Sequence, residues 1–316
     1  MRLATINIWS GLDYQGLLRC GAYETDSERE VRYRHLVERL KALDADVIAV
    51  NEANPVAGMM RRLAADLGYH QVHWRGVAGV RLGPIGLPAN LDEGDGILAR
   101  RELGLVPVAR ARLTGGLLGR WGSLNFSNAT QVVCGRITFN KVPVYLFNTH
   151  WTVARTAADY AAQATYRDAT ANAKAKDAHG KASVTRLVES RRTLRAMQQI
   201  LPPDARAILC GDLNASPNAP EIRAIENAGF IDAFQHVRPQ SAGATWDARR
   251  NDIIRKFYRN GDQAPDEAVR VDYIFVNHPV AAALTDVRLG LHELSDRPHP
   301  SDHFALVCDL DPSFFG

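Results

Sequence analysis

The chain contains short apolar runs, rich in Val, Ile, Phe and Tyr, that turn residues separate from one another. Runs of this length and composition are typical of strands. We therefore expect eight strands, at residues 3–7, 46–51, 96–99, 130–139, 143–149, 207–211, 271–276 and 304–310. Several of these runs end on or next to a polar residue, so the same pattern indicates where reactive side chains can gather.

Helical patterns lie between these runs. Apolar residues recur at helical spacing after Ser27, which can cap a helix together with Glu30 three positions later. A second helix is expected to end at Gly68, because glycine readily takes the left-handed conformation that terminates helices. A third helix, at residues 184–201, is followed by two prolines that stop it. We expect these helices to be structural.

Two long strands, 130–139 and 143–149, follow each other through a short link. Such a pair predicts a hairpin, so the protein would be an α/β fold with mixed sheets, and two sheets packed together would fit. No linker or shift in composition divides the chain, so we expect a single domain over residues 1–316. The alanine-rich segment 151–181 interrupts the pattern and is either an additional helix or a mobile flap.

The composition argues against some classes of protein but does not identify a binding partner. A formal charge of +3 and a pI near 8.7 are too mildly basic to identify a nucleic-acid binder. The four cysteines have no Cys-x-x-Cys spacing, which argues against a zinc motif and a disulfide framework and favours a reducing compartment. The first residues do not resemble a secretory signal, and no apolar run approaches the roughly 20 residues of a membrane span. We expect a soluble, cytoplasmic protein with no integral membrane segment and no obligate protein partner.

Carboxylates and amides at strand ends are the first candidates for chemistry. Glu52 comes shortly after four apolar residues, and an oxygen ligand of this kind suits Mg²⁺ or Mn²⁺. Asp212 and Asn214 lie two positions apart, so on an extended backbone both project to the same side. The carboxylate can take a proton from water, and the amide can donate to a phosphate oxygen. Each group is also an ordinary strand-end or turn residue, so their combination matters more than any one of them.

Two histidines also stand at strand boundaries, His150 after a threonine and His303 after Asp302. A lone histidine is most often a core residue with satisfied hydrogen bonds. Here Asp302 and His303 place a potential metal ligand beside a potential general base, and Asp272 offers a carboxylate that can hold an imidazole tautomer. The pairing therefore indicates a site more strongly than either histidine does.

Taken in order, these clusters resemble the endonuclease/exonuclease/phosphatase superfamily of metal-dependent phosphoesterases. The matching segments span nearly the whole chain, at residues 5–7, 51–52, 94–98, 148–150, 211–214, 270–274 and 301–303. The resemblance implies a DNase I-like four-layer α/β sandwich, in which helices flank two packed mixed sheets and the site lies at one sheet edge.

The resemblance also implies a metal site for Mg²⁺ or Mn²⁺. Glu52 resembles the principal metal ligand, with Asn7 nearby and Asp302 completing or supporting the metal shell. Asn51 stands where glutamine is common before this glutamate, a change that the chemistry should tolerate. A hard cation that polarises a phosphoryl oxygen is what phosphoester hydrolysis needs.

The remaining roles follow from the same resemblance. Asp212 would orient the attacking water, and Asn214 would hold the phosphate. His303 would act as general base or phosphate contact, oriented by Asp272. His150 would stabilise charge on the pentacoordinate transition state. This scheme needs no covalent intermediate.

The expected activity is hydrolysis of a phosphodiester or phosphomonoester by an activated water. Trp9 and residues 148–150 look more like the sphingomyelinase, phosphoinositide-phosphatase and DNase I-like branches than the abasic-site endonucleases. Nucleic acids, nucleotides, and lipid or inositol phosphates all stay open as substrates, so a nuclease and a lipid-headgroup phosphoesterase are alternatives. A further alternative is a non-catalytic binding protein on the same scaffold, which the retention of Glu52, Asp212 and His303 disfavours.

Overall fold

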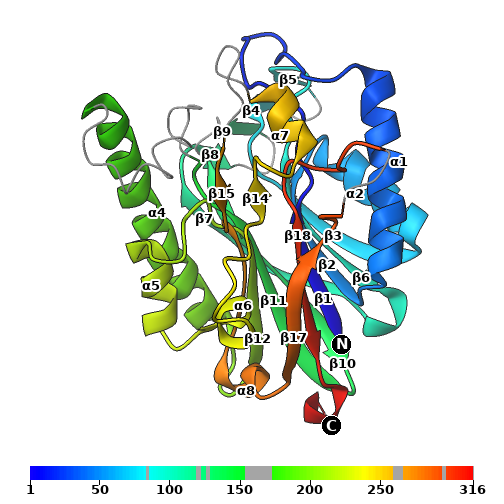
Figure 1. Ribbon diagram of the computed structural model, residues 1–316, viewed down its shortest axis with the longest axis vertical. Coiled ribbons are helices and arrows are strands. Elements are labelled where there is room, and N and C mark those ends of the chain that lie inside the picture. The colour runs from blue at the N-terminus through cyan, green and yellow to red at the C-terminus, as the bar shows by residue number, and fades with distance from the viewer. Residues whose placement is uncertain are drawn as a thin grey trace.

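Figure 1 shows the computed structural model, which describes residues 1–82, 85–118, 122–125, 129–153, 173–258, 266–293 and 297–315. Two six-stranded sheets pack against each other in the centre, and helices lie on their outer faces. Both chain termini lie in the lower half of the view, away from the end that carries β4, β5 and the loop before α1.

The first sheet contains both the amino-terminal and the last strand. Its strands, in spatial order, are β17 (Leu284–Gly290), β18 (Ala305–Leu310), β1 (Arg2–Asn7), β2 (Val47–Ala53), β6 (Gly94–Arg100) and β3 (Tyr69–Arg75). The pair β1 and β2 is parallel, and the other neighbours are antiparallel.

The second sheet has the same number of strands and one parallel pair, β11 with β12. Its strands, in spatial order, are β13 (Ile231–Asp232), β16 (Asp272–Val276), β12 (Arg206–Asp212), β11 (Val142–His150), β10 (Thr130–Phe139) and β7 (Val106–Thr114). Two small sheets lie outside this pair: one of β5 (Ile85–Leu87), β4 (Gly79–Leu82), β9 (Gly122–Asn125) and β8 (Leu117–Leu118), and one of β14 (Trp246–Asp247) and β15 (Ala268–Val269).

In the part of the chain that the structure describes, four longer helices cover the two large sheets. They are α1 (Asp26–Leu43) and α2 (Val56–Leu67) on the first sheet, and α4 (Ala173–Ile200) and α5 (Pro220–Asn227) on the second. The shorter helices are α6 (Ala233–Val237), α7 (Asp252–Phe257), α8 (His278–Ala281), η1 (Arg101–Leu103) and η3 (Pro312–Phe315). None of the helices in the described residues is long and apolar enough to cross a membrane.

Alternating side chains of the central strands build three apolar layers. In β1, Leu3 packs between the two sheets, whereas Ala4 packs toward α1 and α2. In β12, Ile208 packs between the sheets and Leu209 toward α4 and α5. Because successive residues of a strand point to opposite faces, a strand covered on both faces must be apolar throughout. The predicted four-layer α/β sandwich is therefore confirmed.

The start of α1 differs from the prediction. The helix is capped by Thr25, whose Oγ1 accepts from the backbone N of Glu28 at 3.3 Å, while the Glu28 carboxylate accepts from the Thr25 backbone N at 2.9 Å. The predicted cap with Ser27 and Glu30 was wrong by two residues, because both pairs have the spacing of a capping box. Both lie on the same helix, so the error moves only its boundary.

Two other predictions on helices can be compared. The end of α2 at Gly68 is confirmed, with a left-handed φ of 75° at the glycine. The helix predicted at 184–201 begins earlier, because α4 starts at Ala173. The last part of the 151–181 segment is thus helical, while residues 154–172 lie outside the described residues.

The strand directions bring the polar strand ends to one edge. Residues Asn7 and Asn51 are paired at the ends of the parallel strands β1 and β2, and β11 and β12 end at the same edge. The antiparallel strands β6, β10, β16 and β18 begin there. Segments that are far apart in sequence therefore deliver their side chains to one place.

Candidate active site

The carboxylate of Asp212 lies at the centre of this edge. Its Oδ2 accepts a hydrogen bond from Asn7 Nδ2 at 3.1 Å. The same oxygen is 3.6 Å from His150 Nε2 and 3.8 Å from His303 Nε2. All three partners thus direct a nitrogen at one buried oxygen, so the structure brings together four of the residues predicted from sequence.

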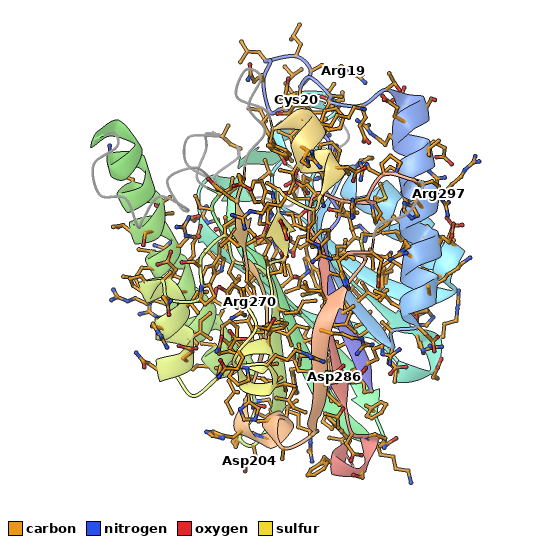
Figure 2. All side chains as sticks on the ribbon, in the orientation of Figure 1. Arg19, Cys20, Asp204, Arg270, Asp286 and Arg297 are labelled. Carbon is orange, nitrogen blue, oxygen red and sulfur yellow. The ribbon has the colours of Figure 1, made fainter. Side chains whose placement is uncertain are left out.

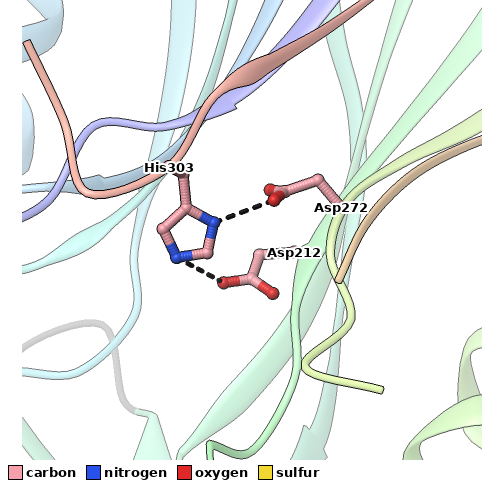
Figure 3. A group of neighbouring side chains, drawn as sticks. All are labelled: Asp212, Asp272 and His303. Atoms are coloured by element: carbon pink, nitrogen blue, oxygen red, sulfur yellow. Dashed lines mark hydrogen bonds and ion pairs between the residues drawn. The ribbon is translucent and has the colours of Figure 1, made fainter. Parts of the chain in front are cut away.

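His303 is held between two carboxylates, as Figure 3 shows. Its Nδ1 is 2.8 Å from Asp272 Oδ2, and Asp272 pairs directly with Asp212 across β16 and β12. All three side chains are buried, and their ligand atoms lie within 4.8 Å of one another. The arrangement fixes the imidazole ring, and the three groups are also close enough to hold a metal ion.

Glu52 is presented by an irregularity in β2. The pairing of β2 with β6 shifts between Val50 and Ala53, and Glu52 has a left-handed φ of 57°. Its Oε1 accepts from Asn7 Nδ2 at 2.8 Å, and its Oε2 accepts from the backbone N of Ser10 at 3.1 Å. Non-glycine residues in this conformation cost about 1 kcal/mol or more, and such strain is concentrated at functional sites.

Asp302 reaches the site from the segment before β18. Its Oδ2 accepts from the hydroxyl of Tyr258 at 2.9 Å, and that hydroxyl accepts from Trp9 Nε1 at 3.0 Å. The neighbouring Ser301 donates to the backbone oxygen of Asn7 at 2.6 Å, so its hydroxyl ties two segments of the edge together. Tyr258 was not predicted as a site residue, and its position 44 residues before Asp302 gives no local signal.

Asn214 lies just beyond the end of β12. Its backbone N donates to Asp212 Oδ1 at 2.9 Å, and its Nδ2 donates to the backbone oxygen of Trp151 at 3.1 Å. Its left-handed φ of 49° is a second strained position in the site. The amide therefore fixes the turn that holds the Asp212 carboxylate.

A cavity of about 580 Å³ opens in front of this edge. Four predicted site residues line it, namely Glu52, His150, Asp302 and His303. The other four are buried and are not among its lining residues: Asn7, Asp212, Asn214 and Asp272. The wall also includes Glu93, which accepts from the hydroxyl of Tyr14 and was not predicted. Glu93 precedes the Gly94–Arg100 strand directly, and only that position could have suggested it.

Carboxylates control the charge of both histidines. Burial by itself lowers the pKa of an imidazole, but nearby carboxylates, led by Asp212, outweigh it and raise the pKa of His150 to about 9. At His303 burial is likewise outweighed, first by Asp272, and the pKa lies well above its ordinary value. Both rings therefore carry a positive charge at neutral pH when no metal ion is bound.

The pKa values of three acidic residues at the site are raised as well, which favours their neutral forms. Burial raises the pKa of Asp302 to about 6, and the charge of Glu52 adds to this effect. Burial raises the pKa of Glu93 to about 8, and again the charge of Glu52 adds to it. The pKa of Asp212 is also raised, mainly by burial and then by Asp272. Packing several carboxylates into one edge is unfavourable until a cation arrives.

The residues present fit a hard divalent cation. The described residues that line the cavity include no Lys or Arg. They include five carboxylates, those of Asp13, Glu52, Glu93, Asp95 and Asp302. Carboxylate and amide oxygens are the ligands that Mg²⁺ and Mn²⁺ prefer. The oxygens of Asn7, Glu52 and Asp302 would hold such an ion at the cavity. The trio of Asp212, Asp272 and His303 offers a second arrangement that includes a nitrogen.

Two buried amides join the sheets directly behind the site. Asn148 of β11 donates through Nδ2 to the backbone oxygens of Val50 and Gly96 in the other sheet, at 3.0 Å each. Asn51 of β2 donates to Asn148 Oδ1 at 3.1 Å and to Asp95 Oδ1 at 2.8 Å. The site residues are divided between the two sheets, and these hydrogen bonds connect the two sheets next to the site.

Comparisons with solved structures agree on the architecture. The chain is similar to a D. rerio TDP2 humanised by 14 mutations, with a TM-score of 0.63, 17% identity and 98% of each chain covered. It is also similar to D. rerio TDP2 complexed with a single-strand DNA product (TM-score 0.60, 17% identity, 98% and 97% covered). The human Nocturnin catalytic domain with bound sulfate gives a TM-score of 0.59 at 18% identity, with 98% and 92% covered.

Two further comparisons are with curated proteins and with models of protein families. No curated protein matches the chain. The model of the Endonuclease/Exonuclease/phosphatase family matches residues 4–303, which include every site residue described above. The fold, the buried Asp, Asp and His cluster and this match agree, and the chain belongs to the Endonuclease/Exonuclease/phosphatase family.

Proposed function

We propose that the protein is a Mg²⁺- or Mn²⁺-dependent phosphoesterase that hydrolyses a phosphodiester or phosphomonoester by direct attack of water. The observation that carries the proposal is the position of Asp212 Oδ2, which has the Asn7 amide and both imidazoles within 3.8 Å. A carboxylate fixed in this way can take a proton from water while cationic rings face the charge that develops on phosphate. Members of this family are generally Mg-dependent phosphoester hydrolases.

Glu52, Asn7 and Asp302 would hold the cation, because Glu52 and Asp302 line the cavity and the Asn7 amide is hydrogen-bonded to Glu52. When bound, the cation would polarise a phosphoryl oxygen and lower the pKa of a water molecule. The hydrogen bonds of Asn7 to Glu52 and Asp212 connect the metal ligand to the residue that takes the proton.

The raised pKa values separate the roles of Asp212 and the two imidazole rings. Because His303 is cationic at neutral pH, it suits a phosphate contact better than a general base, and Asp272 keeps its Nδ1 protonated. Asp212 then takes the proton, and its raised pKa brings it closer to neutral pH. His150 would stabilise charge on the transition state, and the second N–H of the Asn214 amide is left for a phosphate oxygen.

A nuclease remains the second candidate. Its support is the D. rerio TDP2 structure with a single-strand DNA product, a protein whose fold this chain shares. An extended polyanion normally follows a basic groove. The described lining residues of the cavity are acidic and aromatic instead, which supports a substrate with one phosphate in the site.

The test is hydrolysis of bis-p-nitrophenyl phosphate with Mg²⁺, with Mn²⁺ and with EDTA. We expect turnover only with a divalent cation. The double variant Asp212→Ala/His303→Ala should lose about 10³-fold or more, since it removes the proton acceptor and a cationic ring.

The matched control is Asp204→Asn/His236→Ala, which alters an acid and a histidine that are both exposed and outside the site. This variant should keep the wild-type rate. Turnover that persists in EDTA, or an unchanged rate in the Asp212→Ala/His303→Ala variant, would contradict the proposed function.

A further inference from the structure

The most exposed large apolar side chains gather at the end of the molecule that carries the cavity. Leu17 and Leu18, in the loop before α1, are 88% and 71% exposed, and Leu82 and Ile85 are 73% and 77% exposed. Figure 2 places Arg19, which follows this leucine pair, at the upper tip of the molecule, and Figure 1 shows β4 and β5 beside the same loop. Contiguous exposed apolar surface is uncommon on soluble proteins and generally marks a contact.

The small sheet contributes one continuous apolar side. Val80 pairs with Leu87 and with Leu124, and Leu82 pairs with Ile85. Directly paired residues lie on the same side of a sheet, and so do residues two apart in one strand. All five of these side chains are exposed, so this side of the sheet has no described partner packed on it.

The loop and the small sheet are joined into one surface. The backbone N of Ala89 donates to the Leu18 oxygen at 2.7 Å, and Cys20 and Asn90 exchange two hydrogen bonds of 2.8 and 2.9 Å. Beneath them Cys20 packs with Leu12 and Leu91 in a small buried cluster. We call this surface the apolar face. It is composed of Leu17, Leu18, Val80, Leu82, Ile85, Leu87 and Leu124.

The charge of these segments has one sign. Residues 14–22 and 79–91 contain two arginines and no Asp or Glu. Arg19 is exposed beside the leucine pair, whereas Arg81 is buried and donates to the backbone oxygen of Leu91 at 2.7 Å. An aliphatic surface with a cation at its tip complements an anionic lipid surface.

The apolar face is continuous with the cavity of the proposed site. Leu12, Tyr14 and Gln15 line the cavity, and Leu17 follows two residues later. Val77, just before β4, also lines it. Whatever covers the apolar face is therefore held next to Glu52 and Asp302, at the place where a phosphoester would bind.

We propose that the apolar face docks on the surface of a lipid bilayer, so that the phosphoester presented to the cavity is the headgroup of a phospholipid. This inference rests on the proposed phosphoesterase function. A protruding loop tip with two leucines suits insertion among acyl chains, and Arg19 suits the phosphate level above them. A second copy of the chain seated on the same face would lie against the mouth of the cavity, which favours the lipid surface as occupant.

The experiment measures cosedimentation of the full chain with vesicles of phosphatidylcholine, with and without phosphatidylserine, in EDTA so that no hydrolysis is needed. Wild type should bind, more tightly when phosphatidylserine is present. We expect two double variants, Leu17→Ser/Leu18→Ser and Leu82→Ser/Ile85→Ser, each to weaken vesicle binding about tenfold or more. Each variant removes two apolar side chains whose burial in the bilayer would favour binding. Arg19→Gln should weaken binding only to the anionic vesicles.

The matched control is Val31→Ser/Val184→Ser, which changes two exposed apolar residues on α1 and α4, at 53% and 66% exposure. This variant should bind vesicles like wild type. The leucine variants should hydrolyse bis-p-nitrophenyl phosphate at the wild-type rate, and lose activity only toward phospholipid in vesicles.

The outcomes separate the two proposals. Absent vesicle binding, equal binding by the leucine variants, or a wild-type dimer in solution that Leu17→Ser/Leu18→Ser dissociates would each overturn lipid docking. Vesicle binding that depends on the apolar face, together with no metal-dependent phosphoester hydrolysis, would support docking and overturn the proposed function instead.

Discussion

The edge around Asp212 and the apolar face around Leu17 lie at the same end of the molecule, and they place their side chains in opposite ways. At the edge, carboxylates and imidazoles are buried: Asp212, Asp272 and His303 are almost inaccessible to solvent. On the apolar face, Leu17, Leu18, Leu82 and Ile85 are the most exposed large apolar side chains of the described residues. The pair of Arg2 and Asp309 shows the usual pattern, because both charged side chains are partly exposed.

Both departures are unfavourable for the isolated protein. Burying several charges lowers stability unless partners or ions balance them, and exposed apolar surface lacks favourable contacts. In each region a ligand of suitable chemistry would remove the cost: a cation and a phosphate at the edge, an acyl layer at the apolar face. The comparison indicates that the burial of a side chain has to be judged together with the ligand that is expected to contact it. Variants at the edge and variants on the apolar face can each test this interpretation.

The largest effect is expected from Asp272→Asn. The carboxylate that holds His303 Nδ1 at 2.8 Å is lost, so the rate of phosphoester hydrolysis should fall about 10³-fold. The pKa of His303, at present raised because the carboxylates outweigh burial, should fall as well. Imidazole titration by NMR and the pH profile of kcat/KM would measure both, with Asp286→Asn, at a partly exposed acid outside the site, as control.

The sign of the accompanying stability change follows from the same pKa. A histidine whose folded pKa is raised contributes stability that is fully present below its unfolded pKa, near 6.5, and that is lost as the pH rises through the folded pKa. In Asp272→Asn this contribution should shrink, so the metal-free variant should lose most stability, relative to wild type, in acidic solution. Equal losses of unfolding free energy at pH 6 and at high pH would contradict this origin.

A smaller effect, with the opposite sign, is expected from Glu93→Gln. Burial raises the pKa of Glu93 from 4.5 to about 8, so the folded protein binds this proton more tightly than the unfolded chain, and stability falls between these pH values. The Gln variant lacks that loss and should be more stable above pH 8 by about 1–3 kcal/mol. Urea unfolding in EDTA at pH 5 and pH 9 would measure it.

The control for Glu93→Gln is Glu38→Gln, at an exposed acid that pairs with Arg297 on the surface. It should show little dependence on pH in the same comparison. If Glu93→Gln instead lowered stability at pH 9, the buried carboxylate would have to be a stabilising group in its ionised form.

The smallest effect is expected from Leu17→Ser/Leu18→Ser. Because both side chains are exposed and make few contacts, the unfolding free energy should change by no more than about 0.5 kcal/mol. Urea unfolding without vesicles is the measurement. A loss above about 1 kcal/mol would show that the leucines are packed in solution, and the contrast between the two regions would then disappear.

The sequence predicted the central strands but not those at the sheet edges. The strands that were missed include β3, β7 and β17, which all lie at the ends of the two large sheets. An edge strand is half exposed, so its sequence mixes charged and apolar residues, as in the Tyr-His-Gln-Val-His-Trp-Arg of β3. A continuous apolar run indicates a strand that is buried on both faces, and edge strands are not buried in this way.

The predicted site residues were found through strand ends and family order, and their roles stay predictions. Glu93 and Tyr258 were missed because their importance arises from contacts across the fold: Tyr258 meets Asp302, and Glu93 faces the same cavity as Glu52. The apolar face was missed for a related reason. Its strands have only two to four residues, too few for alternation to be recognised in sequence.

The amides of Asn51 and Asn148 have a consequence for how the site can change over evolution. The proposed metal ligand Glu52 belongs to one sheet and the proposed proton acceptor Asp212 to the other, and Asn148 donates hydrogen bonds across the gap to Val50 and Gly96. Core substitutions that would slide one sheet over the other are resisted at this point. The loops around the cavity can therefore diverge toward new substrates while the distance between the two halves of the chemistry is inherited unchanged.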